Sequence, residues 1–228
     1  MAAQIAHKAA INGTLTAYFS HEMTGDQIVR RLAYNLGKII AADARAGRLT
    51  PEEKDRLKFQ IAKIGESELH TCERGRNVLQ MASEIRTLQA RKKKRVGLVV
   101  VDHIQLMRGC RSSYSNRTQE LTEISGDLKA LALDNGLAMI CLSQLNREPG
   151  KRNGGRPTID DLRESGSISA DSDNVWLIHW PQFSAPDDPT LLNRIILILA
   201  KLREGELRDV ELKWNGAYLR FENRPEAA

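Results

Sequence analysis

The sequence predicts an α/β domain in which a mostly parallel, twisted sheet is flanked by helices and followed by an antiparallel hairpin. Three observations predict this fold class. Short apolar, β-branched runs alternate with longer segments of helical spacing. Two of the runs, GLVVV and IILILA, are apolar at every position, as expected for strands buried on both faces. Near the end of the chain, Asn215-Gly216 separates two short runs, which is a strong hairpin signal.

The expected strands are spaced along the chain with room for helices between them. We expect the strands of the sheet at residues 15–19, 97–101, 137–142, 175–179 and 195–200, and those of the hairpin at 210–214 and 218–221. No repeat, low-complexity stretch or linker interrupts the sequence. Residues 1–228 are therefore predicted to form one domain.

Helices are predicted from their spacing and from the residues at their ends. Residues 24–46 form one expected helix, which Thr24 caps and in which Gln27 completes a capping box. A second helix follows Thr50, with a proline and two acids in its first turn. Further helices are expected at residues 78–94 and 118–135, the latter ended by a glycine.

The composition is that of an ordinary globular protein, with 41% hydrophobic and 28% charged residues. No apolar run approaches the roughly 20 residues that a membrane span requires, so no membrane partner is expected. The three cysteines are odd in number and widely spaced. This pattern favours reduced thiols in a cytoplasmic protein over a disulfide framework or a zinc site.

The net charge of +5 is compatible with a polyanionic partner, although many cytosolic proteins carry a similar charge. Basic residues gather at positions 91–95 (RKKKR) and 147–156 (REPGKRNGGR). The first cluster either ends a helix, where lysines suit the helix dipole, or serves targeting or phosphate binding. The second is rich in glycine and lies in an expected loop, which makes it the better nucleic-acid candidate.

Two acids follow predicted strands directly. Asp102 ends the strand in GLVVVDHIQL, where open α/β sheets bind ligands and where a carboxylate can hold Mg²⁺ through its water shell. Glu22 follows the strand in TAYFSHEM, and a glutamate beside a metal-bound phosphate chain can activate the attacking water. Asp102 could equally cap the next turn, and Glu22 could be a solvated acid near a helix amino terminus.

Three further polar residues end predicted strands. Gln144, in MICLSQLNR, could hydrogen-bond a terminal phosphate or be an ordinary polar loop residue. Lys201 and Arg203, in AKLREG, could reach one phosphate together or be two solvated charges. Each signal is weak alone. Together they place two acids, an amide and two cations in one layer of the expected fold.

The stretches VVVDHIQLM, NRTQELTEISGDLKALA, LSQLNR and above all DLRESGSISADSD closely resemble the DnaB-type replicative DNA helicases. The similarity covers essentially the whole chain, and the DLRESGSI segment is highly specific. The resemblance implies a RecA-like carboxyl-terminal ATPase domain, assembled as a hexameric ring that uses ATP and Mg²⁺ to move along single-stranded DNA. His103 departs from the family, which usually has tyrosine there.

By motif, the resemblance implies a role for each candidate residue. Glu22 would be the catalytic glutamate and Asp102 the Walker B aspartate that holds the magnesium shell. Gln144 would be the phosphate sensor, contributing to both catalysis and nucleotide binding. Lys201 and Arg203 would reach the nucleotide of a neighbouring subunit, with Arg203 as the arginine finger. In the loop that lines the DNA channel, the residues matching the family are Arg163, Glu164 and Gly166.

The Walker A motif GxxxxGK[ST] does not occur in the sequence, because Gly37-Lys38 is followed by isoleucine and is expected inside a helix. Residues 2–10 resemble the helix that normally follows this loop. The strand feeding the loop is internal in the family, so its absence would unpair two neighbouring strands. We therefore expect impaired ATP binding by the isolated chain. The alternative function is a non-catalytic ring subunit that binds or regulates an intact helicase.

Overall fold

The computed structural model describes residues 1–73, 75–111, 113–145 and 155–224. By its internal contacts the chain divides into two compact units, Met1–Ser143 and Gln144–Ala228. The sequence showed no boundary at this point. Within the described residues, no helix is both long and apolar enough to cross a membrane.

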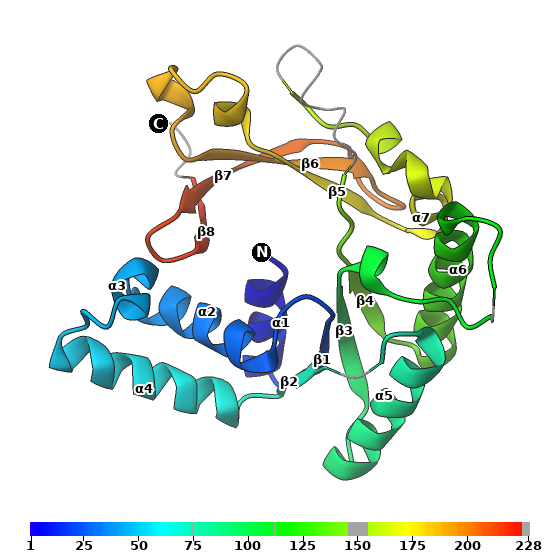
Figure 1. Cartoon of the computed structure of the whole chain (residues 1–228), viewed down its shortest axis with the longest axis horizontal. Helices are drawn as coiled ribbons and strands as arrows, with labels where there is room; N and C mark the ends of the chain where they lie inside the picture. The colour runs from blue at the N-terminus through cyan, green and yellow to red at the C-terminus, as the bar shows by residue number, and fades with distance from the viewer. Residues whose placement is uncertain (74, 112, 146–154, 225–228) are drawn as a thin grey trace. The chain divides into compact units, whose positions relative to one another are not determined.

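The first unit is a parallel sheet covered by helices (Figure 1). Its strand order is β2-β1-β3-β4, and all three strand pairs are parallel. Its strands are β1 (Leu15–Ser20), β2 (Leu69–Cys72), β3 (Val96–Asp102) and β4 (Ala138–Cys141). Its helices are α1 (Ala2–Ile11), α2 (Gly25–Gly37), α3 (Ala41–Arg45), α4 (Pro51–Glu66), α5 (Val78–Lys92), η1 (Ile104–Leu106) and α6 (Arg117–Asn135).

The helices of the first unit cover the two faces of its sheet separately. Alanines of α1 and apolar residues of α2 pack with Tyr18, Leu98 and Val100 in one buried cluster. Because side chains alternate along a strand, Phe19 and Val99 point to the opposite face, on which α5 and α6 lie (Figure 1). Burial on both faces explains why β3 is apolar over nearly its whole length.

The predicted first long helix is wrong in one respect, because residues 24–46 form two helices. The predicted capping box at Thr24 is present. The backbone amide of Gln27 donates to Thr24 Oγ1, and the backbone amide of Thr24 donates to Gln27 Oε1. Helix α2 ends where Lys38 adopts a left-handed conformation with φ of 48°. Gly37-Lys38 is therefore a helix end and not a helix interior. Strand β2 was not foreseen, since its four residues LHTC carry little apolar pattern.

The second unit is an antiparallel sheet of order β5-β6-β7-β8. Its elements are η3 (Ile159–Ser165), α7 (Gly166–Asp171), β5 (Val175–His179), η4 (Pro181–Phe183), η5 (Pro189–Leu191), β6 (Arg194–Lys201), β7 (Asp209–Asn215) and β8 (Arg220–Asn223). The predicted hairpin is present as β7 and β8. The expectation that β5 and β6 are parallel strands is wrong, because they pair antiparallel, with Val175 opposite Lys201 and His179 opposite Ile196. The segment between them contains short 3₁₀ turns and not the helix that usually makes a parallel crossover.

Strands β4 and β5 are each the outermost strand of their own sheet among the described residues. In β4, Ala138 and Cys141 are exposed and the two apolar residues between them are half-buried. In β5, Trp176 and Ile178 are about half exposed, at 48% and 44%. An apolar strand with an open edge can accept another strand.

Candidate active site

The structure brings Glu22 and Asp102 to the same rim of the parallel sheet. Strands β1 and β3 are parallel neighbours, and Ser20 is the register partner of Asp102. The His21 amide continues the ladder by donating to the Asp102 carbonyl oxygen at 2.8 Å. Glu22 follows one residue later. This register confirms the prediction that Asp102 and Glu22 lie at the carboxyl ends of strands.

Asp102 is held by a tyrosine that the sequence analysis missed. Tyr18 lies two residues before Ser20 on β1, and its hydroxyl donates to Asp102 Oδ2 at 2.6 Å. The tyrosine is 3% exposed, and its burial, together with its hydrogen bond to Asp102, raises the pKa of its hydroxyl. The hydroxyl therefore stays protonated and fixes the orientation of a partly exposed carboxylate.

Glu22 lies in solvent but next to an imidazole. Its side chain is 64% exposed, whereas that of His103 is 8% exposed. His103 Nδ1 lies 3.6 Å from Glu22 Oε2. His103 therefore forms part of the immediate surroundings of Glu22. An exposed carboxylate can reach a water molecule without first breaking a buried contact.

The oxygen donors at this rim fit a water-held Mg²⁺. Within the described residues, no group of three histidine, cysteine or acidic side chains is arranged to bind a metal directly. Mg²⁺ usually keeps several waters and takes one or two carboxylates together with substrate phosphates. Asp102 can supply such a carboxylate, so the site suits an ion held through its water shell and not an all-protein cage.

Gln144 lies beyond the strand that was expected to end with it. Strand β4 stops at Cys141, and the chain then stays attached to the first unit as far as Ser143. The Leu142 amide donates to Val101 O at 2.9 Å, and Gln105 Nε2 donates to Ser143 Oγ at 2.8 Å. Gln144 is exposed and is the first residue of the second unit. Its sensor role stays a prediction.

Lys201 and Arg203 contact the segment between η3 and β5 within the second unit. Lys201 Nζ donates to the carbonyl oxygens of Ser169 at 2.7 Å and Ala170 at 3.2 Å, near the carboxyl end of α7. Arg203 Nη1 pairs with Asp173 at 2.9 Å, and the arginine side chain remains 73% exposed. Arg203 is thus accessible to another molecule, while Lys201 is committed to α7 carbonyls in this chain.

The predicted DNA loop is described only in part. Arg163 and Glu164 belong to η3, and their side chains lie outside the described residues. Gly166 begins α7 and is exposed. The segment is anchored where the Thr158 amide donates to the buried Asp161 at 2.7 Å. A short helical segment with a fixed start can present backbone amides to a phosphate.

The glycine-rich basic loop lies largely outside the described residues, which leave out positions 146–154. Its described end, Arg156, forms a two-pronged ion pair with Asp209, with both N–O distances at 2.8 Å. This pairing ties Arg156 to β7. Its side chain remains 48% exposed, and the rest of the loop lies outside the described residues, so the nucleic-acid role of the loop stays a prediction.

Comparison with known proteins places the whole chain in one family. The family described as DnaB-like helicase C terminal domain matches residues 1–223. The replicative DNA helicase DnaB of Mycobacterium leprae is 38% identical over 90% of this chain, and that of Geobacillus stearothermophilus is 35% identical over 91%. These alignments cover 33% and 45% of the relatives, so the chain spans less than half of either.

Two solved structures share the fold. One is described as an ATPase domain; it superposes with a TM-score of 0.90 at 29% identity, covering 98% of this chain and 79% of that one. A DnaB-like replicative helicase, described with its interactions with primase, gives the same TM-score and identity and is covered to 54%. The chain belongs to the DnaB-like helicase C-terminal domain family.

Proposed function

We propose that this chain is the nucleotide-hydrolysing part of a ring-shaped replicative helicase, which uses ATP and Mg²⁺ to move along single-stranded DNA in the cytoplasm. The observation that carries the proposal is the pairing of Ser20 with Asp102, which brings Glu22 and Asp102 to one rim. Family membership supports the reaction class. In this proposal Asp102 holds the magnesium shell and Glu22 activates the attacking water.

The remaining candidate residues are given roles that fit their surroundings. Arg203 has an exposed guanidinium held by Asp173 and would stabilise charge on the nucleotide of an adjoining subunit. Gln144 would sense the terminal phosphate, and Lys201 would position α7 near the DNA loop. Arg163, Glu164 and Gly166 would follow the single-strand backbone without reading bases.

We further propose that these residues alone bind ATP weakly, since their sequence contains no GxxxxGK[ST] loop to cradle phosphates. The expected ATPase activity of the isolated chain is therefore close to background. Robust magnesium-dependent turnover that Glu22→Ala abolishes would contradict this part of the proposal.

The DNA role is tested separately by measuring the anisotropy of a labelled single strand. We expect weak, salt-sensitive binding that differs little between base sequences. Arg163→Ala should weaken it about equally for all base sequences and reduce the salt slope by about 1. The control is Arg56→Ala, which removes the same charge from the exposed face of α4. Equal affinities for the Arg163→Ala variant and the unmodified chain would remove the DNA-loop assignment.

A second candidate function is that of a ring subunit that cannot hydrolyse its own nucleotide. It is favoured by the same missing phosphate loop combined with the accessible Arg203. Such a subunit would enter a ring of intact homologues and still offer Arg203 to a neighbour. Mixing this chain with an intact homologue and measuring unwinding separates the two candidates. Stoichiometric inhibition or rescue supports the subunit role, and no effect without co-migration counts against it.

A further inference from the structure

Five consecutive cations lie at the end of the first unit opposite to the acids. Residues 91–95 (RKKKR) connect α5 to β3, and all five are exposed. Asp102 ends the same strand that begins immediately after this run. The basic cluster and the candidate active site are therefore at opposite ends of β3. The function proposed for the acids leaves the basic cluster unexplained.

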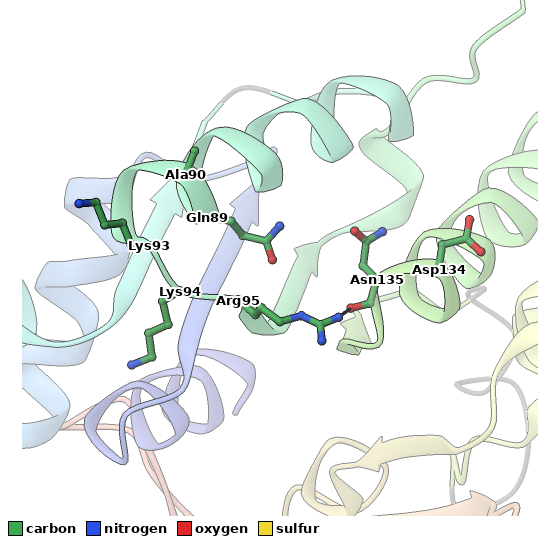
Figure 2. Close-up of a pocket in the computed structure, with 7 residues that line it drawn as sticks. All are labelled: Gln89, Ala90, Lys93, Lys94, Arg95, Asp134 and Asn135. Carbon is green, nitrogen blue, oxygen red and sulfur yellow. Dashed lines mark hydrogen bonds between the residues drawn. The ribbon is translucent and has the colours of Figure 1, made fainter.

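The backbone at the helix end spreads these side chains apart. Arg91 and Lys92 occupy the last turn of α5, and Lys93 has a left-handed conformation with φ of 52°. Figure 2 shows that Lys93 and Lys94 extend to one side, while Arg95 extends to the other, toward Asn135. Arg95 Nη2 donates to the Asn135 carbonyl oxygen at 3.0 Å. Arg95 is therefore held toward α6, on the other side from the two lysines.

A shallow depression lies beside Lys93, Lys94 and Arg95. It has a volume of about 440 Å³ and is lined by Gln89, Ala90, Lys93, Lys94, Arg95, Asp134 and Asn135 (Figure 2). Ala90 is the only apolar side chain in this lining. A peptide partner usually needs large apolar or aromatic anchors in a pocket. The lining therefore suits a partner that is recognised by charge.

The nearby acids do not balance the cations. Glu68 lies 3.8 Å from Lys92 and 3.4 Å from Lys94, and Asp134 lines the depression. Arg91 also lines a second depression together with Glu73 and Glu84, so five cations face four acids and the local excess is about +1 by simple subtraction. Burial, and then the charges of Lys92 and Arg91, lower the pKa of His70 even though Glu68 opposes them. The local potential is positive.

We infer that the basic cluster of residues 91–95 is a second binding surface for the phosphodiester backbone of DNA, separate from the proposed DNA loop at Arg163. The inference rests on the proposed DNA role of this chain. Lysines spread along an exposed turn match a polyanion whose charges repeat along its length, and they carry no means of reading bases. An acidic protein segment would use the same charges but would find no apolar anchor here.

The test measures DNA affinity as a function of salt for two charge-matched variants of the chain. One carries Lys92→Gln, Lys93→Gln and Lys94→Gln, and the control carries Lys54→Gln, Lys58→Gln and Lys63→Gln on exposed positions of α4. Both lose three charges from the same unit. Each is titrated with a labelled single strand and with a hairpin duplex between about 50 and 200 mM salt.

We expect the slope of log K against log salt to become shallower by about 2 for the single strand or about 3 for the duplex in the basic-cluster variant only. If only one form of DNA shows its expected change, that form is the one bound at the basic cluster. Two outcomes overturn the inference. Either neither variant changes the slope of log K against log salt, or both variants reduce that slope by the same amount. If Arg163→Ala weakens binding while the basic-cluster variant does not, the further surface fails and the proposed DNA loop stands. If the basic-cluster variant weakens binding while Arg163→Ala does not, the proposed DNA loop fails and the further surface stands.

Discussion

At the scale of single residues, the hydrogen bond between Tyr18 and Asp102 is the interaction that orders the rim. The hydroxyl donates at 2.6 Å from a nearly buried ring. Hydrogen bonds to charged groups contribute about 1.5–3 kcal/mol. We therefore expect Tyr18→Phe to lower the free energy of unfolding by about that amount, because Asp102 loses a donor and no new partner replaces it.

A double-mutant cycle with Asp102→Asn separates the hydrogen bond from general packing. Urea unfolding of the two single variants and the double variant should show a coupling energy of about 1 kcal/mol or more. Strictly additive effects would mean that the loss in Tyr18→Phe does not come from the contact with Asp102.

The residue types at the rim could be read from the sequence, but their partners could not. Asp102 and Glu22 stand out because each follows an apolar run directly. Tyr18 and His103 give no such signal, since a tyrosine inside a strand and a histidine after one are common core residues. Their contacts depend on which face each side chain takes and on the register of β1 against β3. The sequence of one strand does not contain that register.

At the scale of elements, two helical glycines, Gly25 and Gly126, differ in the space that surrounds them. A Cβ on Gly25, at the start of α2, would lie 2.5 Å from Thr71 Oγ1 on β2. A Cβ on Gly126, on the exposed side of α6, would meet nothing within 4 Å among the described atoms. Gly25 therefore allows a close approach between helix and sheet, whereas Gly126 only weakens its helix.

We expect Gly25→Ala to destabilise the chain by about 1–3 kcal/mol through this collision. The matched variant Gly126→Ala should stabilise it by up to about 1 kcal/mol, because alanine favours a helix interior. Thermal unfolding of both variants measures the difference. A stabilising Gly25→Ala would show that β2 can move away from α2 without cost.

The predicted helix ends are correct where a local capping residue sets them. Thr24, Thr50 and Gly136 end or begin helices as expected, because a capping side chain acts within three or four residues. The break at Lys38 was missed, since a lysine in a left-handed conformation has no distinctive pattern. The direction of β5 and β6 was also missed, because apolar runs look alike in parallel and antiparallel sheets.

At the scale of the whole molecule, buried histidines make stability depend on pH. Burial is the largest cause that lowers the pKa of His7, His70 and His179, so each favours its neutral form in the folded chain. The unfolded chain binds protons more readily, near the ordinary histidine pKa of about 6.5. Their contribution is therefore present above about pH 6.5 and is lost as the pH falls through the lower folded values.

Urea unfolding at about pH 7.5, 6.5 and 5.5 should show a decreasing free energy of unfolding with a constant m value. His7→Gln should remove part of this decrease, because His7 is buried in α1 and both causes that act on it, burial and the charge of Lys8, lower its pKa. Stability that does not change over this range in the unmodified chain would show that the histidines titrate alike in both states.

The sequence by itself determined the fold class, most strands and helices, the family and the residue types that carry the proposed chemistry. These depend on local patterns: apolar runs, helix caps, and motifs such as DLRESGSI. Only the tertiary structure decided which side chains meet. The pairing of Tyr18 with Asp102, the approach of His103 to Glu22 and the attachment of Lys201 to α7 all join residues from separate elements. Such contacts are set by strand register and helix packing, which no single segment specifies.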